Sequence, residues 1–456
     1  MKNFSFSSPW IHQLNFPTIH QKIEENFSTD VAVIGAGIAG VSTAYFALKN
    51  TNKKITLIEA YKVAHGATGH NGGQMVSYFE HPFADLVEKY GITLAARAQA
   101  DIYNTWDLVD QIFEEEKLKT PMNKVTGYAG CTSVDQINLY LKNIKYQREA
   151  GLDIEGVLVA NIPEVISQIR EEYSELYARV DHEYILEILE TENKNYIGAL
   201  ASLKGCMNSA LFCEDLIDVM LKKYPGRFSV YENSPVDSIT LNKKNGVVHV
   251  GDFSVEAERI VLCTNGFENF TIHNAVGKDI NTKFHDLVIG TVGYMAAFLE
   301  EKGRDPVAIS YFSTPGIDEK DPYFYFTRRP YKHKQKGDWS LVSIGGPEQQ
   351  FPNKSYYERE RLPYPEKAAE EIDKFFHSTY KFAPKENIDY LFYWHGLMGY
   401  TPSGMRCIGP EPINPVLMYN LGCNGVGLLS SIYGGFRISK FLNKKKLEKS
   451  IFDPMV

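Results

Sequence analysis

Three glycines near the N-terminus have the spacing and the neighbours that dinucleotide binding requires. They form the segment Gly35-Ala36-Gly37-Ile38-Ala39-Gly40, which follows the apolar run 31–34 and precedes an alanine-rich stretch that continues to about residue 49. The apolar run is typical of a parallel strand buried on both faces. Gly35 permits a tight turn, Gly37 lets the backbone approach a pyrophosphate, and Gly40 allows close helix–strand packing. We therefore predict a phosphate-binding helix N-terminus formed by Gly35, Ala36, Gly37, Ile38 and Gly40.

An acidic residue stands where such a site binds ribose. Residues 54–59 are predicted as the next strand, and Glu59 ends it with Ala60 beside it. A carboxylate at this place accepts hydrogen bonds from ribose hydroxyls and disfavours a 2′-phosphate, so NADP is not expected. A purely structural glycine turn is the alternative. The order strand, glycines, helix, strand and acid argues against it.

A second glycine-rich segment, residues 65–74, follows directly. It holds four glycines and no large apolar side chain, so we do not expect it in a core. From composition alone a flexible surface loop is the favoured interpretation, but the position just after Glu59 indicates further contact with the dinucleotide. The predicted contact residues are Ala67, Thr68, His70, Asn71, Gly72, Gly73 and Gln74.

A third glycine segment, residues 421–427, leads into a predicted helix that ends near residue 442. A second helix N-terminus facing the ligand would place positive potential where a reduced flavin holds negative charge. An ordinary turn between a strand and a helix is the alternative. The predicted contact residues are Gly422, Asn424, Gly425, Val426 and Gly427.

Composition and charge exclude several classes of protein. The 456 residues include 48 Lys+Arg and 56 Asp+Glu, a net charge of −8, with 44% hydrophobic and 23% charged residues. These are ordinary globular values, and the acidic balance argues against a nucleic-acid partner. Six scattered cysteines form no zinc-type cluster, so no metal site is predicted and a reducing compartment is expected.

No secretory signal is recognised at the start of the chain. The most hydrophobic early stretch, residues 31–48, contains the three glycines and is interpreted as a strand and a helix rather than a membrane span. We therefore expect a soluble, cytoplasmic protein.

The elements along the rest of the chain alternate in type. Residues 81–200 are predicted to be mostly helical, and residues 228–262 hold four short strands with a hairpin turn before Gly246. Aromatic strands follow, with one helix at 366–376, and a further strand is expected at 416–420.

We predict an α/β fold with interleaved domains, because the nucleotide-type features lie at both ends and in the middle of the chain. Residues 1–80, 201–280 and 391–456 are assigned to a discontinuous Rossmann-like cofactor domain. Residues 81–200 and 281–390 are assigned to an α+β substrate domain built on a mixed, largely antiparallel sheet.

The whole chain resembles the FAD-dependent oxidoreductases of the D-amino-acid-oxidase type, which include glycine oxidase, sarcosine oxidase and γ-glutamylputrescine oxidoreductase. The resemblance rests on residues 33–40, 66–74, 257–266, 394–402, 407–410 and 422–427. It implies that FAD is the cofactor, that the first and last of these segments bind it, and that Val236 stands where a backbone amide meets the adenine. Residues 71–74, Asn-Gly-Gly-Gln, are most similar to the γ-glutamylputrescine oxidoreductase branch.

Two positions depart from these relatives. Monomeric sarcosine oxidases attach the flavin through a cysteine, and matching Thr401-Pro402 puts Gly396 at that place, which excludes such a bond. At His70 the putrescine-type branch usually has arginine, and a histidine near this place carries covalent flavin in the dimethylglycine-dehydrogenase-like branch. Because residues 71–74 follow the non-covalent branch, we predict non-covalent FAD, with attachment at His70 as the alternative.

The resemblance implies oxidation of a small amine or amino acid. A hydride leaves the carbon that bears a neutral amine for the flavin N5, and water hydrolyses the resulting imine to an aldehyde or keto acid. Oxygen, giving hydrogen peroxide, or another acceptor then takes the electrons. Two alternatives stay open, a dehydrogenase with a non-oxygen acceptor and a non-catalytic, regulatory FAD-binding protein.

The candidates for substrate contact lie in the aromatic region. Strand alternation in residues 323–326 puts the two tyrosines on one face and the two phenylalanines on the other. Tyr325 and Tyr400 are expected to border the flavin, and Arg328 is a candidate carboxylate clamp. Aromatic residues that only fill a sheet core, and a solvated pair of Arg328 and Arg329, are the alternatives.

Overall fold

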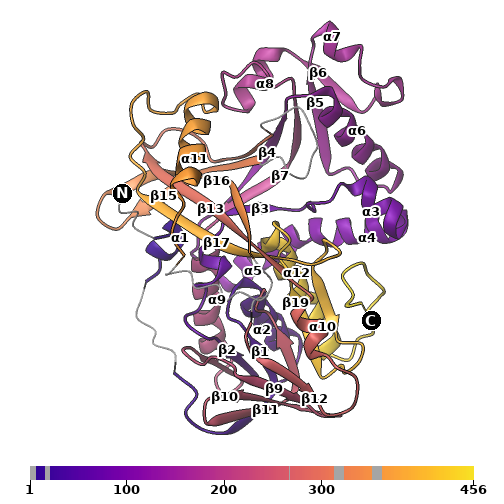
Figure 1. The fold of residues 1–456 in the computed structure, drawn as a ribbon, viewed down its shortest axis with the longest axis vertical. Coiled ribbons are helices and arrows are strands. Elements are labelled where there is room, and N and C mark those ends of the chain that lie inside the picture. The colour runs from indigo at the N-terminus through magenta and orange to yellow at the C-terminus, as the bar shows by residue number, and fades with distance from the viewer. Residues whose placement is uncertain (1–6, 16–20, 266–267, 313–322, 352–361, 456) are drawn as a thin grey trace.

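Two β-sheets form the framework of the protein. The computed structural model describes residues 7–15, 21–265, 268–312, 323–351 and 362–455. Figure 1 shows one sheet above the other, each with helices packed against it, and the chain passing between them several times. This arrangement confirms the predicted fold class of a cofactor-type α/β unit interleaved with an α+β unit.

The first sheet contains the predicted dinucleotide-binding strands at its centre. Strand β1 (Phe27–Ile34) lies between β11 (Phe253–Leu262) and β2 (Ile55–Ile58), and both pairings are parallel. Strand β8 (Phe228–Tyr231) continues the sheet in parallel beyond β2, and β19 (Leu417–Leu421) pairs in parallel with β11. The last four residues of β1 and all of β2 are buried, as expected for strands covered on both faces.

Four further strands complete the first sheet. β9 (Ser238–Leu241) and β10 (Gly246–Val250) form the expected antiparallel hairpin, and β10 pairs in the same way with β11. β12 (Thr271–Asn274) lies parallel to β9 at the edge, and β18 (Cys407–Pro410) lies antiparallel to β19.

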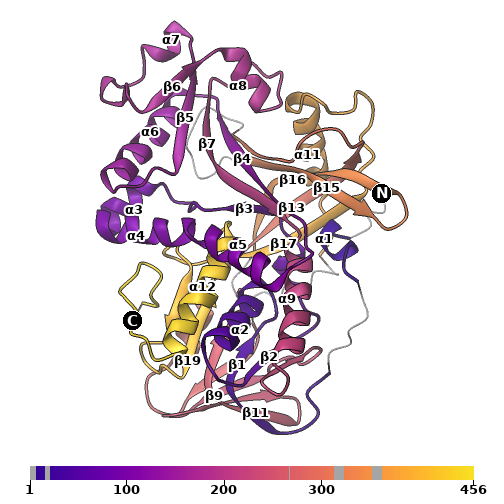
Figure 2. The ribbon, with the colours of Figure 1, turned by 180° about the vertical axis from the view of Figure 1, so that it is seen from behind.

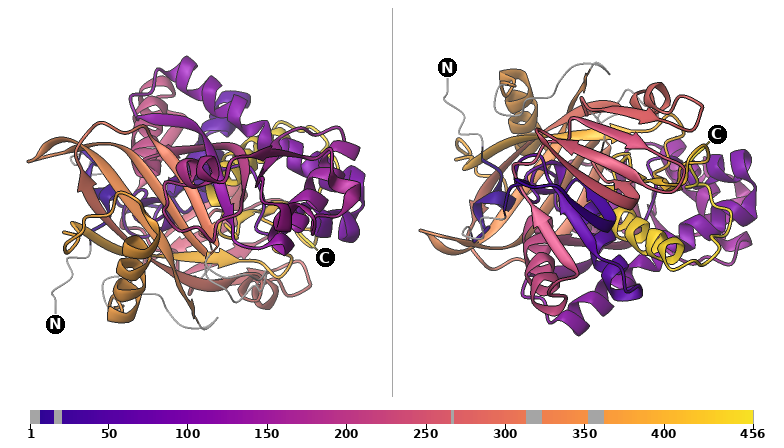
Figure 3. Two further views of the ribbon diagram at one scale, coloured as in Figure 1. Left: turned by 90° about the horizontal axis from the view of Figure 1, so that it is seen from above. Right: turned by 90° about the horizontal axis from the view of Figure 1, so that it is seen from below.

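Three long helices pack on this sheet: α2 (Ile38–Asn50), α9 (Ser209–Lys223) and α12 (Gly427–Leu442). Figures 2 and 3 show α12, in yellow, alongside α2. Eleven residues of α2 are buried, Ile38–Leu48, because the helix is enclosed by the sheet and the other helices. The apolar stretch at residues 31–48 is therefore a buried strand and helix, and no helix within the described residues has the length and apolar character to cross a membrane.

The second sheet has ten strands, and most of its pairings are antiparallel. Its strands, in spatial order, are β17 (Phe392–Tyr400), β13 (Ile289–Glu300), β16 (Gly337–Phe351), β15 (Tyr323–His333), β14 (Val307–Phe312), β4 (Met122–Cys131), β7 (Gly198–Met207), β5 (Glu155–Ala160) and β6 (Tyr177–Val180), with β3 (Gln74–Val76) also paired to β7. Among the pairings of the described residues in this sheet, only β14–β4 and β5–β6 are parallel. The sheet is thus mixed and largely antiparallel, as predicted.

The remaining helices lie around the second sheet and in the connections, and one of them packs against β12 of the first sheet. They are α1 (Pro9–His12), α3 (Phe83–Tyr90), α4 (Ile92–Tyr103), α5 (Thr105–Glu116), α6 (Val134–Glu149), α7 (Pro163–Ile166), α8 (His182–Ile188), α10 (Asn281–His285) and α11 (Glu366–Thr379), with 3-10 turns at Ala67–Gly69 and Glu171–Tyr173. Helix α6 begins in a capping box in which Ser133 and Gln136 satisfy each other's backbone N–H groups.

The prediction of a mostly helical 81–200 segment was incomplete. β4, β5, β6 and β7 lie within it or at its end. Exposed and buried residues alternate only weakly in these strands, so pairing within the ten-stranded sheet decides their conformation. The domain limits remain a prediction; β17, inside the 391–456 portion, pairs in the second sheet.

Candidate functional site

A cavity of about 1180 Å³ lies between the two sheets. Its walls come from the carboxyl ends of β1, β2 and β11, from the glycine-rich segments after β2 and β19, and from β13, β15, β16 and β17. In a sheet of this type ligands bind beyond the carboxyl ends of the strands, so its position identifies the candidate site.

Most of the predicted site residues line this cavity. They are Gly35, Gly37, Ile38, Glu59, Ala60, Ala67, Thr68, His70, Asn71, Gly72, Gly73, Gln74, Val236, Gly425, Val426 and Gly427, together with Tyr325 and Tyr400. Ala36, Gly40, Gly422 and Asn424 lie behind the lining and shape the turns. Arg328 is not part of the wall.

The first glycine turn is fixed by close backbone contacts. Gly35 has φ +96°, and a Cβ there would be 2.9 Å from the carbonyl oxygen of Cys263. A Cβ on Gly40 would overlap the carbonyl oxygen of Gly35, so helix α2 packs directly on the turn. Both positions therefore require glycine, which agrees with the roles predicted for them.

Glu59 ties this turn to the end of β2. Its carboxylate accepts hydrogen bonds from the backbone N–H groups of Ala36, at 2.8 Å, and Tyr61, at 3.0 Å. Burial raises the pKa of Glu59, and these backbone donors oppose the shift. Its carboxylate also borders the cavity, where the predicted ribose contact remains a proposal.

The segment after β2 is an ordered wall of the cavity. The side-chain amide of Asn71 donates to the carbonyl oxygen of Thr68 at 2.7 Å and to Ser209 Oγ at 2.8 Å, and its Oδ1 accepts from Gly73 N at 2.7 Å. The Nδ1 of His70 donates to the carbonyl oxygen of Gly66 at 2.9 Å. The polar side chains therefore hold the backbone in place.

Sequence reasoning missed the contribution of the first residues to this wall. Trp10 of α1 is fully buried, donates from Nε1 to the carbonyl oxygen of Asn71 at 2.6 Å, and packs edge to face on Trp394. A Cβ on Gly73 would run into the Trp10 ring. This region lies outside every glycine motif, and only the apolar Trp10 signals its packing role.

The third glycine segment is also held from behind. Asn424, with φ +45°, accepts from the backbone N–H of Thr401 at 2.8 Å through Oδ1, and a Cβ on Gly422 would be 2.6 Å from Thr401 Cγ2. Arg406 donates to the carbonyl oxygens of Asn420, at 2.8 Å, and Gly422, at 3.3 Å. The guanidinium of Arg406 therefore places a positive charge beside this loop.

The cradle formed by these segments fits a dinucleotide with a flavin. Helices α2 and α12 both begin at the cavity, so their partial positive charge faces it; the first N–H of α2, on Ile38, donates to Thr68 Oγ1 at 2.9 Å, and α12 has no side-chain cap. Thr264 Oγ1, in the same wall, is buried and has no hydrogen-bond partner among the described residues. A ligand with phosphates and hydrogen-bonding edges satisfies these groups.

The tyrosine face of β15 forms the opposite wall, as strand alternation predicted. Tyr323 and Tyr325 line the cavity, whereas Phe324 and Phe326 pack in the core against α11. Glycines make room for the Tyr325 ring, because a Cβ on Gly72 would be 2.8 Å from it and one on Gly345 would overlap it.

Two carboxylates stand on this wall that sequence reasoning did not identify. Glu80 accepts from the Tyr323 hydroxyl at 3.0 Å, and Glu348 lies on β16 opposite Gly293 of β13. Burial raises the pKa of each to about 7, and Glu80 contributes to the shift of Glu348. Neither residue belongs to a recognisable motif, so no local sequence signal indicated them.

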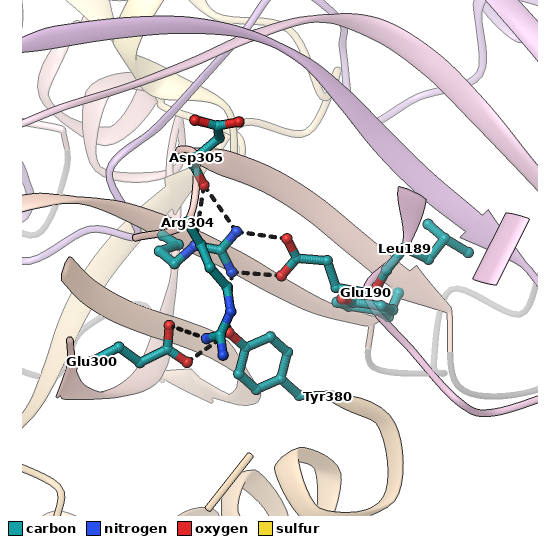
Figure 4. A network of polar contacts seen from close by, with 8 residues as sticks. Leu189, Glu190, Glu300, Arg304, Asp305 and Tyr380 are labelled. Carbon is teal, nitrogen blue, oxygen red and sulfur yellow. Dashed lines mark hydrogen bonds and ion pairs between the residues drawn. The ribbon is translucent and has the colours of Figure 1, made fainter. Parts of the chain in front are cut away.

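Arg328 corrects a prediction. Its side chain is buried on the phenylalanine face of β15 and forms a bidentate pair with Glu190, with both N–O distances at 2.6 Å. It also donates to the Tyr380 hydroxyl at 3.1 Å and to the carbonyl oxygen of Asp305. Figure 4 shows this network, in which Glu300 binds both Tyr380 and Arg304. Arg328 is therefore neither a clamp in the cavity nor a solvated residue.

Comparison with known proteins identifies the family. A family model described as FAD dependent oxidoreductase (DAO) matches residues 30–440. The chain belongs to this family, and its cofactor is FAD.

Similarity to individual proteins is more distant. The chain is 23% identical over 256 residues to the probable oxidoreductase OrdL of Haemophilus influenzae, covering 55% of this chain and 53% of that protein. It is 35% identical over 74 residues to γ-glutamylputrescine oxidoreductase of Escherichia coli, covering 16% and 17%. These matches span about half the length of the first relative and less of the second.

Solved structures share the fold over nearly the full chain. L-proline dehydrogenase from P. horikoshii superposes with a TM-score of 0.68 at 15% identity, covering 94% of this chain and 97% of that one. Glycine oxidase from Geobacillus kaustophilus gives 0.66 at 13% identity, covering 93% and 98%. At these identities the likeness concerns the fold.

Proposed function

We propose that the protein oxidises a small amine or amino acid at the C–N bond, with FAD accepting the hydride. The observation that carries this proposal is the shared cavity, in which the glycine-rich cofactor walls face the tyrosines of β15 and β17. A substrate between these walls is adjacent to the cofactor. The relatives named as a putrescine-derivative oxidoreductase, a proline dehydrogenase and a glycine oxidase support the same reaction class.

The residues of this chain bind and orient the reactants. The starts of α2 and α12 and the carboxylate of Glu59 would hold the cofactor, with Val236 beside its adenine. Tyr325 and Tyr400 enclose the substrate and exclude water. The reacting amine must be neutral, because its lone pair assists departure of the hydride, and an enclosed cavity disfavours an unpaired ammonium.

An anaerobic substrate screen tests the proposal. The purified holoprotein is mixed with amines and amino acids without oxygen, and loss of the oxidised-flavin absorbance is followed. At least one compound should bleach the flavin and yield an aldehyde or keto acid. If dithionite reduces the flavin but no amine or amino acid does, the protein is not an amine oxidoreductase.

The electron acceptor is tested separately. We propose oxygen as the acceptor, so peroxide should form in air in proportion to the substrate consumed. Rapid anaerobic reduction combined with slow reoxidation in air would instead identify a dehydrogenase.

A further inference from the structure

The wall opposite the cofactor loops is negatively charged. We propose that Glu80 and Glu348 select an aliphatic diamine or polyamine without a carboxylate at the reacting carbon, which enters as a dication and whose reacting amine loses its proton before the hydride leaves. The inference rests on the proposed function and names its substrate class. It is carried by the positions of the two carboxylates, by the groups around them, and by the lack, among the described residues, of an ion-pair partner for either carboxylate.

Glu80 stands between the cofactor loop and the tyrosine face. A Cβ on Gly425 would be 2.8 Å from Glu80 Oε1, so the carboxylate touches the loop at the start of α12. The Tyr323 hydroxyl donates to the same oxygen at 3.0 Å. The other carboxylate oxygen has no hydrogen-bond donor among the described residues, and the side chain lines the cavity.

Glu348 lies farther along the same wall. Its register partner on β13 is Gly293, and a Cβ on Gly293 would be 3.6 Å from the Tyr325 hydroxyl. Within the part of the chain that the structure describes, the Glu348 carboxylate has neither a hydrogen-bond donor nor an ion-pair partner. Its side chain is solvent-accessible and lines the cavity.

The hydroxyls nearby are unsatisfied as well. Tyr325 and Tyr400 both line the cavity, and neither hydroxyl has a hydrogen-bond partner in the described ranges. A ligand with polar hydrogens would satisfy both hydroxyls. Their rings also provide faces over which an ammonium binds favourably.

The electrostatic balance favours two positive charges. The nearest buried cation, Lys204, bonds to Ser310 Oγ at 3.1 Å and the carbonyl oxygen of Tyr128 at 3.3 Å. It acts on both Glu80 and Glu155 without a direct ion pair to either. Lys204 therefore offsets one of the charges on Glu80 and Glu155, Glu348 has no ion-pair partner among the described residues, and a dication neutralises the excess.

A substrate that bears a carboxylate would be repelled by the same two acids. Among described residues, the basic side chains of the cavity wall are Lys62, His65, His70 and Arg406. The first three come from the segment after β2, and Arg406 is bound to the carbonyl oxygens of Asn420 and Gly422. An α-carboxylate at the Glu80–Glu348 wall would thus be repelled without a guanidinium clamp, since Arg328 is paired elsewhere.

A matched series of five-carbon compounds tests the inference. Anaerobic stopped-flow reduction of the flavin gives the Kd and the limiting rate for 1,5-diaminopentane, pentylamine, 5-aminopentanoate and norvaline. We expect the Kd of the diamine to be about tenfold or more below that of pentylamine, equivalent to about 1.4 kcal/mol. We expect norvaline and 5-aminopentanoate to bind more weakly than pentylamine.

Paired variants assign the preference to the carboxylate. In Glu348→Gln the Kd ratio between pentylamine and 1,5-diaminopentane should fall towards one, and Glu80→Gln should also lower it. Glu301→Gln, the same change at an exposed position outside the cavity, should leave the ratio unaltered. FAD content and thermal unfolding confirm that each variant is folded.

The outcomes separate this inference from the proposed function. Flavin reduction with no preference for the diamine, or with a preference for norvaline, overturns the inference and leaves amine or amino-acid oxidation standing. A diamine preference that survives Glu348→Gln and Glu80→Gln overturns the assignment of these residues. Failure of every amine and amino acid to reduce the flavin overturns the proposed function and the inference with it.

Discussion

The backbone carbonyl of His70 occupies the space in which a side chain on Gly396 would begin, because a Cβ built on Gly396 would overlap that oxygen. Gly396 lies within β17, where it pairs with Gly293, so its backbone is held on both sides. Only glycine fits between this strand and the cofactor loop. The cysteine through which monomeric sarcosine oxidases hold their flavin has no room here.

Substitution of Gly396 should therefore displace the cofactor loop. We predict that Gly396→Ala loses most of its FAD and unfolds at a lower temperature, because the methyl group pushes His70 outward. Gly156→Ala, at a glycine with open space around it, is the matched control and should retain both properties. Flavin absorbance per protein and a thermal melt measure the effect; equal FAD content in both variants would contradict it.

The second prediction concerns how the flavin is held. His70 Nδ1 donates to the carbonyl oxygen of Gly66, so this nitrogen is unavailable for a covalent bond to the flavin without breaking the turn. We predict that acid precipitation releases all the FAD and that the denatured chain has the mass of the polypeptide alone. His70→Ala should still bind FAD, with a shifted reduction potential. A chain heavier by one FAD would disprove non-covalent binding.

The third prediction follows from the corrected position of Arg328. Arg328→Ala leaves the largely enclosed carboxylate of Glu190, 14% exposed, without its partner, and we expect a loss of about 3 kcal/mol of stability, the lower end for a buried pair. Arg97→Ala breaks an exposed pair with Glu448 and should cost under about 1 kcal/mol. Chemical unfolding of the FAD-loaded variants measures both.

Selectivity provides the second readout for Arg328. The Kd ratio between carboxylate-bearing and plain amines should be the same in folded Arg328→Ala as in the wild-type protein, because Arg328 does not reach the cavity. If a stable Arg328→Ala variant bound carboxylate-bearing amines more weakly while its Kd for plain amines stayed the same, Arg328 would be a carboxylate clamp after all.

The cofactor side of the site was accessible from sequence because its signals are local. The turn at Gly35 and Gly40 requires glycine for backbone reasons, and a short apolar run before it indicates a buried strand. The segment around Asn71 is also held by local contacts, since the Asn71 side-chain amide forms hydrogen bonds to Thr68 and Gly73 within the loop. The residues that make such contacts are close together in the sequence, so a local sequence pattern can predict them.

The substrate side depends on pairings between distant strands. Glu348 faces the cavity because β16 pairs with β13 in one register, and that register is not written in the sequence around it. The strand pattern itself contains a signal that Arg328 does not face the cavity. Alternation places residue 328 on the same face as Phe324 and Phe326, and the parity that assigned Tyr325 to the cavity assigns Arg328 to the core.

The last prediction is a pH dependence of binding. The pKa values of Glu80 and Glu348 are raised to about 7, so both carboxyls are largely protonated below that pH and ionised above it. Burial also lowers the pKa of Lys204 to about 7, so its opposing charge is lost as the pH rises. Tyr323, Tyr325 and Tyr400, which face the acids, have raised pKa values and stay neutral.

Ionisation of the two carboxyls and loss of the Lys204 charge both favour binding of a cation as the pH rises. The Kd of 1,5-diaminopentane should fall as the pH rises from about 6 to about 8, while the amine itself remains protonated in solution. Because loss of the substrate proton also affects the reduction rate, the Kd and not the rate is the quantity compared. Glu348→Gln should make the dependence of Kd on pH shallower, and Glu301→Gln should leave it unchanged. A Kd for the diamine that rises over this interval would show that the two carboxylates do not bind its positive charges.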